Sequence, residues 1–167
     1  MSSSLDHHMS VERELHAVGM ALSGEEDSAR VIELVLSIAQ KLLRADSGSI
    51  VLARDDVGLE LACVHADGES RLIDHADEDQ PPLPVLTLDP PRSIAAHAIA
   101  GEETLHRPDW NAVTDRDLTE EPDLELACGI LQEAVVAVPL RSHRGEILGA
   151  LQVGRRPVEG GSSGFDA

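Results

Sequence analysis

Hydrophobic residues recur at helical spacing in two segments near the start of the chain. Residues 10–22 are predicted to form a helix with one narrow apolar stripe of Val11, Leu15, Val18 and Leu22. Asp27 is suited to cap a second helix, whose stripe consists of Val31, Leu34, Val35, Ile38 and Leu42. Ser47-Gly48 breaks this second pattern. The first stripe fits a partner helix in a homodimer as well as it fits the domain's own sheet.

The pattern becomes strand-like after the second helix. Residues 49–53 are a short continuous apolar run, which predicts a central strand covered on both faces. A turn at 55–58 and alternating apolar positions over 59–64 predict a hairpin, with Leu59, Leu61 and Cys63 on its inward side. Cys63 is therefore interpreted as a small core residue.

Two further strands are predicted over residues 134–140 and 147–153, joined by a turn at 142–145. Pro139 indicates a bulge or an unpaired amide near the end of the first of them.

The middle of the chain is less regular. Residues 65–92 are acidic and contain five prolines, which predicts a long loop with one edge strand near 85–88. Ser93 is suited to cap a short helix that Gly101 ends, and a short strand is predicted over 104–106. Residues 107–128 are acidic and irregular, with a helical turn from Pro122 to Ala127. Helices separated from antiparallel hairpins predict an α+β fold.

Charge narrows the expected partners. The chain has 167 residues, with 13 Lys+Arg against 31 Asp+Glu, so its formal charge is −18. This charge repels phosphate backbones and anionic lipid, so no nucleic acid and no membrane partner is expected. The sequence has neither a signal peptide nor an apolar run long enough to span a bilayer, which favours the cytoplasm.

The organisation along the chain follows from composition. Residues 1–8 are small and polar and are predicted to be a disordered tail, and residues 9–157 are predicted to form one domain. Residues 158–167 are rich in glycine and serine, as expected of a linker to a missing C-terminal region.

Catalytic signatures are absent from the sequence. It has no phosphate-binding glycine loop, no nucleophile elbow and no paired metal-binding histidines on a helix. Cys63 and Cys128 are too few for a zinc site, and the acidic neighbours of Cys128 would raise its pKa and weaken it as a nucleophile. The acidic residues of the 65–92 loop do not follow the spacing of a calcium loop. We therefore expect no enzyme activity and no metal.

Three short motifs occur one after another along the chain. Residues 45–52 follow the second helix, residues 93–98 precede Pro108-Asp109, and residues 134–140 precede a Gly-Glu turn and a Gly-x-Leu-Gln strand over 144–153. Together these motifs resemble GAF domains, the small-molecule and redox-sensing modules of bacterial signalling proteins. The resemblance covers residues 10–156.

The resemblance implies an antiparallel sheet of about six strands, with the N-terminal helices packed on one face and a ligand pocket on the other. It implies a non-catalytic small-molecule or redox sensing domain that regulates a downstream effector domain of a longer chain in signal transduction, and a homodimer formed through the N-terminal helices. The chain departs from the family at Gly101-Glu102-Glu103-Thr104, at Gly154-Arg155 and in lacking the usual C-terminal helix, and the second departure argues against cyclic-nucleotide binding.

The resemblance also places the candidate ligand-binding residues, which are Ile94, His97, His106, Asp109 and Trp110. Trp110 is suited either to stack on a ligand or to plug the sheet, and His97 either to contact a ligand or to bond a backbone carbonyl. Neither the ligand nor a cofactor can be named from the sequence. The alternatives are a structural dimerisation module, whose pocket is filled by its own side chains, and a thiol-dependent GAF-type reductase.

Overall fold

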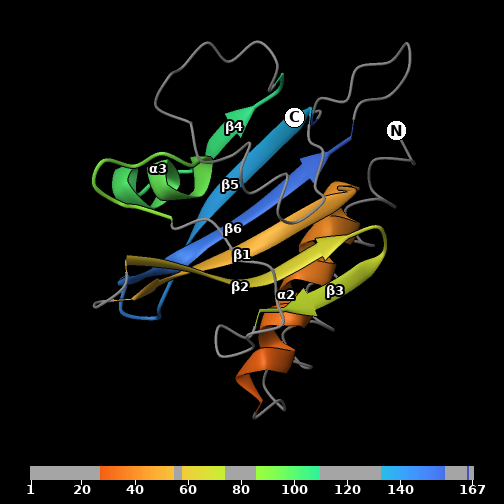
Figure 1. Ribbon diagram of the computed structural model, residues 1–167, viewed down its shortest axis with the longest axis horizontal. Coiled ribbons are helices and arrows are strands. Elements are labelled where there is room, and N and C mark those ends of the chain that lie inside the picture. The colour runs from red at the N-terminus through yellow and green to blue at the C-terminus, as the bar shows by residue number, and fades with distance from the viewer. Residues whose placement is uncertain (1–26, 55–57, 74–85, 110–132, 157–164, 166–167) are drawn as a thin grey trace, which may run out of the picture.

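Antiparallel strands form one sheet in the order β3-β2-β1-β6-β5-β4 (Figure 1). The computed structural model describes residues 27–54, 58–73, 86–109, 133–156 and 165. Within them the strands are β1 (Ser47–Arg54), β2 (Gly58–Ala66), β3 (Glu69–Leu72), β4 (Leu105–Arg107), β5 (Ala134–Arg141) and β6 (Ile147–Arg155), and the helices are α2 (Ser28–Leu43) and α3 (Ile94–Gly101). The predicted α+β fold with an antiparallel sheet of about six strands is confirmed.

Several predicted features lie outside the described residues. These are the tail at 1–8, the helix at 10–22, the helical turn at 122–127, Trp110, Cys128 and most of the linker at 158–167.

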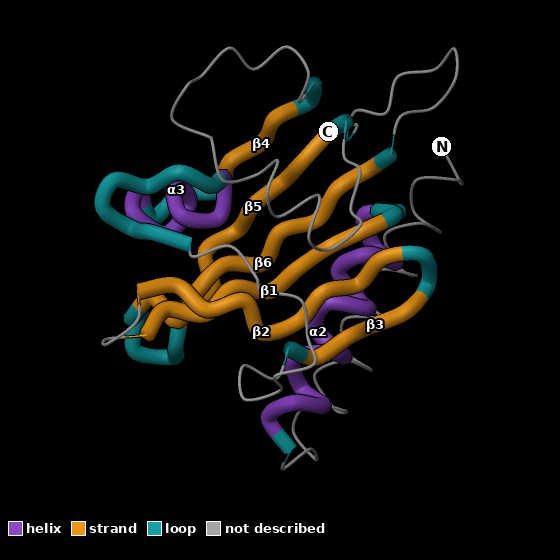
Figure 2. The backbone as a smooth tube through the Cα atoms, in the orientation of Figure 1, coloured by secondary structure: helices purple, strands orange, loops and turns teal. Residues whose placement is uncertain are grey.

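The two helices lie on opposite faces of the sheet (Figure 2). On one face, α2 crosses β1, β2, β3 and β6, and its Leu36 packs on Ile50, Cys63 and Val153. On the other face, α3 contacts β4, β5 and β6 and packs its alanines on Val51. β1 therefore has apolar layers on both sides, as its continuous apolar run predicts.

Helix α2 begins and ends as its sequence dictates. The Asp27 side chain accepts a hydrogen bond from the Ala29 N–H at 3.0 Å, and Arg44 ends the helix with a left-handed φ of 50°. The residues that contact the sheet differ from the predicted stripe, however. They are Ile32, Val35, Leu36 and Ala39, of which the prediction contains only Val35. The helix is apolar over more than one stripe, so spacing alone does not decide which stripe meets the sheet.

A β-bulge changes the face of Cys63. Ile50 pairs with Cys63 while the next residue of β1, Val51, pairs with Leu61, so Ala62 is an extra residue in β2. Leu61 consequently faces α3, whereas Cys63 faces α2. The prediction that Leu59, Leu61 and Cys63 share one face was wrong, because it assumed an unbroken alternation.

The predicted loop at 65–92 begins too early. β2 continues to Ala66, and β3 follows after a two-residue turn in which Asp67 and Gly68 both have positive φ, 54° and 83°. Asp-Gly is the sequence signal for this hairpin turn. Farther along, Leu86 bridges to Leu59 and Leu88 bridges to Pro91, close to the predicted edge strand.

The remaining predicted elements occur with small shifts. Ser93 caps α3 by accepting from the Ala96 N–H at 3.1 Å, but the left-handed residue that ends the helix is Glu102 and not Gly101. β5 and β6 form the predicted hairpin, with a register shift between Leu140 and Arg141. In the described residues, no helix is both long and apolar enough to cross a bilayer.

Candidate ligand-binding face

A row of residues crosses the centre of the sheet on the face that α3 covers. Val64 pairs with Ser49, Ser49 with Gln152, and Gln152 with Ala137. Side chains of directly opposed residues point to the same face of a sheet. Val64 and Ala137 both belong to apolar groups that include residues of α3. Ser49 and Gln152 therefore also lie on the α3 face.

Ser49 and Gln152 are polar groups inside an apolar wall. Each is only 2% exposed, and their row neighbours Val64 and Ala137 are buried too. Ser47 lies two residues along the same face of β1, is fully buried and donates to the Gly154 carbonyl at 3.5 Å. Ligand pockets combine apolar walls with a few fixed polar groups, and this hydroxyl–amide row has that composition.

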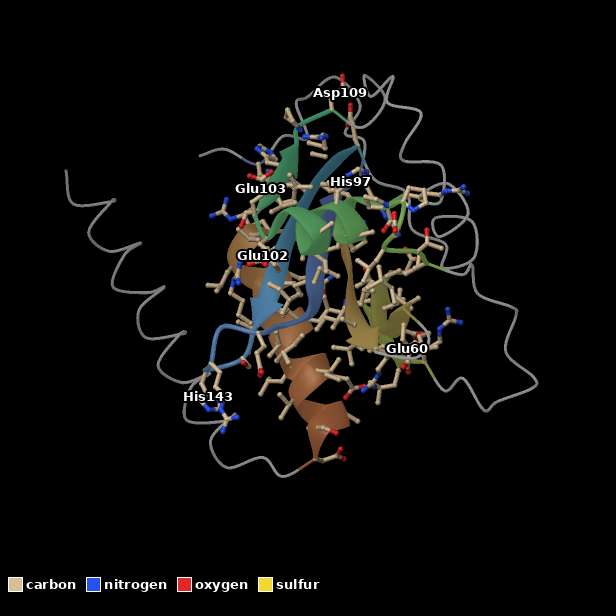
Figure 3. The ribbon with its side chains drawn as sticks, turned by 90° about the vertical axis from the view of Figure 1, so that its left-hand side faces the viewer. Glu60, His97, Glu102, Glu103, Asp109 and His143 are labelled. Atoms are coloured by element: carbon tan, nitrogen blue, oxygen red, sulfur yellow. The ribbon has the colours of Figure 1, made fainter. Side chains whose placement is uncertain are left out.

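Ile94 and His97 belong to α3, whereas Asp109 follows β4, and the three residues differ in burial. Ile94 is 1% exposed and packs on Ala98 and Val135, so it belongs to the core. His97 is half-buried, and its backbone N–H donates to the Ser93 carbonyl at 2.9 Å. Asp109 is exposed and follows β4, at the end of the molecule beyond His97 (Figure 3).

His106 lies on the other side of the sheet. Its neighbour Leu105 pairs with Ala137 and packs with the α3 group. Successive residues of a strand point to opposite faces, so His106 faces the α2 side. There its ring meets Phe165 edge-on, with the ring centroids 6.0 Å apart. The structure thus separates His106 from Ile94 and His97.

Sequence reasoning missed Ser49 and Gln152. The only signal for them is that both are polar residues beside apolar runs, Ser49 before Ile50 and Gln152 between Leu151 and Val153. Recognising them requires the pairing of β1 with β6, which juxtaposes two residues about a hundred positions apart in the chain.

Thiol chemistry is disfavoured at Cys63. Burial raises the pKa of its thiol to about 11, and the negative charge of Glu33 adds to the rise. The side chain is fully buried, and its Sγ lies 3.9 Å from the Val64 carbonyl oxygen. At neutral pH this group is a protonated thiol and a poor nucleophile. Among the described residues, no three His, Cys, Asp or Glu side chains gather as metal ligands would.

The β5–β6 hairpin is hydrogen-bonded to both helices. Arg141 at the end of β5 donates to the Glu102 carboxylate at 3.0 Å and to the Glu102 carbonyl at 2.9 Å, just after α3. Arg155 at the end of β6 donates to the Leu43 carbonyl in the last turn of α2 at 2.7 Å. Its guanidinium also lies over the Phe165 ring, 4.5 Å from the centroid. The hairpin therefore connects the residue after α3 with the last turn of α2.

Comparison with known proteins agrees with this architecture. The GAF domain family matches residues 27–165. The GAF domain of a phosphoenolpyruvate-protein phosphotransferase from Coxiella burnetii is 16% identical, with a TM-score of 0.61 over 95% of this chain and 82% of that one. The corresponding domain from Acinetobacter is 12% identical, with a TM-score of 0.58 over 89% and 78%.

An enzyme has a similar structure as well. Free methionine-R-sulfoxide reductase from Neisseria meningitidis is 17% identical, with a TM-score of 0.60 over 87% of this chain and 72% of that one. At such identities these structures show a shared fold and not a shared activity. No curated protein matches the chain.

Proposed function

Because this chain belongs to the GAF domain family, a family of signalling and sensory modules, we propose that it is a non-catalytic sensory domain of a signal-transduction protein. In this proposal it acts in the cytoplasm. A small molecule binds on the α3 face of the sheet, and its binding regulates an effector domain of a longer chain.

The observation that carries the proposal is the polar row on the α3 face. Ser49 and Gln152 place a hydroxyl and an amide at the centre of a buried sheet face whose other side chains are valine, leucine and alanine. The alanines of α3 that cover this face are small and buried, so in this proposal the ligand makes its room by displacing the helix. His97 on α3 and Asp109 after β4 are the sequence-predicted residues that the proposal keeps as contacts at the edge of the site.

In this proposal the signal passes through the two arginine contacts of the β5–β6 hairpin. A ligand that prefers one position of α3 stabilises that position by its difference in affinity between the two states. Arg141 couples α3 to β5, and Arg155 couples β6 to the last turn of α2. The output in this proposal is therefore a change in the packing of α2.

The surface of α2 suits a homodimer. Val31, Leu34, Ile38 and Leu42 repeat at spacings of three and four, and none of them belongs to the described apolar group that packs on the sheet. All four are half-buried. An apolar stripe left beside the sheet contact is the expected interface of a partner helix, and the proposed dimer forms through this N-terminal helical region.

The raised pKa of Cys63 supports the non-catalytic assignment. A thiol with a pKa of about 11 cannot supply appreciable thiolate at neutral pH. We expect no thiol-dependent reduction of methionine sulfoxide by the parent chain. Turnover that Cys63→Ser or Cys128→Ser abolishes would instead establish the reductase alternative.

A ligand screen tests the proposal. Thermal unfolding of the 167-residue chain is followed with haem, cyclic nucleotides and small organic acids as probes. A ligand present at a hundred times its Kd stabilises the folded state by about 2.7 kcal/mol. We expect one probe class to raise the melting temperature of the parent, and Gln152→Leu to remove most of that rise.

The matched control is Ser142→Ala, in the turn between β5 and β6, which should keep the response. Because Gln152→Leu changes a buried residue, Ser49→Ala serves as a second and smaller change on the same row. If no probe stabilises the parent, or if both row variants respond as fully as the parent does, the sensory proposal fails. The structural dimerisation module then takes its place.

A further inference from the structure

A hollow on the α2 face lies outside the site proposed above. Its volume is about 360 Å³, and it opens between the C-terminal half of α2 and strand β2. Its polar lining residues are Ser37, Gln40, Lys41, Arg44, Asp46 and His65. His65 pairs with Gly48 of β1, whose missing side chain would point toward Leu36 of α2, so the hollow and the α3 face are on opposite sides of the sheet.

Gln40 is the unusual residue of this hollow. It is 6% exposed, yet neither its Nε2 nor its Oε1 has a hydrogen-bond partner in the part of the chain that the structure describes. A buried amide left without partners is costly, and it is compensated when a bound molecule supplies both a donor and an acceptor. Gln40 thus indicates a ligand with a hydroxyl or a similar group.

The charges around Gln40 favour an anion. Lys41 is the only lysine of the chain, and Arg44 is its neighbour one turn farther along. Neither side chain forms an ion pair with any described residue, although the chain carries 31 acidic residues. Asp46, the one acid of the lining, already accepts a hydrogen bond from the Arg156 backbone N–H at 2.9 Å.

The position on the helix does not offer the N–H groups of a typical phosphate site. Phosphate sites are typically built on the N-terminal N–H groups of a helix, whereas this hollow lies at the C-terminal end of α2. The carbonyl groups of Gln40, Lys41 and Leu43 at that end already accept hydrogen bonds, so the positive charges of the lining are what an anion would meet. His65, whose Nδ1 lies 2.8 Å from the Ser70 hydroxyl, still has its Nε2 for a further contact.

We propose that this hollow binds a small organic carboxylate that also carries a hydroxyl group. The carboxylate pairs with Lys41 and Arg44, and the hydroxyl bonds the Gln40 amide. The site is additional to the one on the α3 face and does not depend on it.

The test uses L-malate and succinate, two dicarboxylates that differ by one hydroxyl group. The chain has only four glutamines and one asparagine, so its side-chain amide signals in a ¹H–¹⁵N NMR spectrum are few. Gln40→Met, an apolar side chain of similar length, assigns the Gln40 signal by its loss. We expect malate to shift this signal and to bind about fivefold more tightly than succinate, the effect of one net hydrogen bond.

Charge-matched variants locate the carboxylate. Lys41→Ala should weaken malate binding about fivefold or more, while Arg144→Ala, which removes the same charge from the exposed β5–β6 turn, should leave it unchanged. In Gln40→Met, malate and succinate should bind equally.

Four outcomes would overturn the proposal. They are an unshifted Gln40 signal, equal affinities for malate and succinate in the parent, equal effects of Lys41→Ala and Arg144→Ala, and inorganic phosphate binding as tightly as malate. The Gln152 signal reports on the other face. A probe that shifts Gln152 and not Gln40 therefore supports the sensory site alone, and counts against this one.

Discussion

At the scale of single residues, the burial of Cys63 has a consequence for stability. The folded chain holds its thiol proton up to a pKa of about 11, whereas the unfolded chain releases it near 9.0. Stability is therefore unaffected below pH 9 and falls as the pH rises toward 11, by about 2–3 kcal/mol in all. The chain has no tyrosine and one lysine, so few other groups titrate in that range.

The measurement is urea unfolding at pH 8, 9, 10 and 11 for the parent and for Cys63→Ala. The variant should be less stable at pH 8, because it leaves a cavity, but its stability should decline less steeply above pH 9. Cys128→Ala is the control for the second thiol. Parallel declines in the parent and in Cys63→Ala would contradict the assignment.

Gly48 shows how close α2 lies to the sheet. A Cβ at this position would lie 2.8 Å from Leu36 Cδ1 and 2.9 Å from the Gln152 carbonyl oxygen. Gly48→Ala should therefore destabilise the fold by about 1–3 kcal/mol, since the backbone oxygen cannot move aside cheaply. Thermal unfolding measures the change.

Gly101→Ala is the matched control for Gly48→Ala. It lies in the last turn of α3, where a Cβ meets only the flexible Glu103 side chain, at 3.5 Å. Alanine is favoured over glycine in a helix, so this variant should gain about 0.5–1 kcal/mol. Equal effects of the two substitutions would show that the α2–sheet contact is looser than the distances indicate.

At the scale of elements, α3 depends on its cap. It has only eight residues, and the buried Ser93 hydroxyl satisfies one of its free N–H groups. Ser93→Ala should lower the free energy of unfolding by about 1 kcal/mol, and Ser93→Asp should restore part of the loss. The control is Ser28→Ala in the exposed first turn of α2, where we expect a change near zero. An unchanged Ser93→Ala variant would contradict the capping role.

The apolar stripe of α2 predicts an association state. Leu34→Glu and Ile38→Glu place charges on the stripe that does not pack on the sheet and should convert a dimer to monomers without unfolding the domain. Light scattering across a range of concentrations measures the mass. Leu148→Glu is the control, because Leu148 is 48% exposed on β6. A monomeric parent, or a dimer that survives both substitutions, would refute this interface.

At the scale of the whole molecule, charge opposes the compact state. A net charge of −18 over 167 residues produces self-repulsion, which added salt screens. Raising sodium chloride from 50 to 500 mM at pH 7 should therefore raise the melting temperature, by about 2–4 °C for each kcal/mol gained. The gain should shrink as the pH approaches the isoelectric point near 4.6. A salt effect of equal size at both pH values would point to a cause other than screening.

Much of the architecture could be predicted from the sequence. Asp27 and Ser93 cap α2 and α3, as the sequence predicts. The strands around Ile50, Val136 and Leu151 follow from apolar runs and alternation. β3 was missed although Asp67-Gly68 carries its turn signal, because the acidic and proline-rich composition that follows outweighed a two-residue motif.

The candidate sites could be predicted less well. His97 lies on α3 and Asp109 after β4, but His106 faces the opposite layer, since one residue along a strand reverses the direction of a side chain. Ser49 and Gln152 come together only through strand pairing. Gln40 appears as an ordinary polar residue of an amphipathic helix until its burial is known.

The order of helices and strands along the chain follows from local sequence, because caps, turns and hydrophobic spacing act between neighbours a few residues apart. Which face each side chain joins depends on how distant segments pack. Because of the bulge at Ala62, Cys63 faces α2. Because α2 packs one of its apolar stripes on the sheet, Leu36 is buried there and Leu34 is not. These outcomes depend on packing between distant segments, whose free energy no local pattern contains.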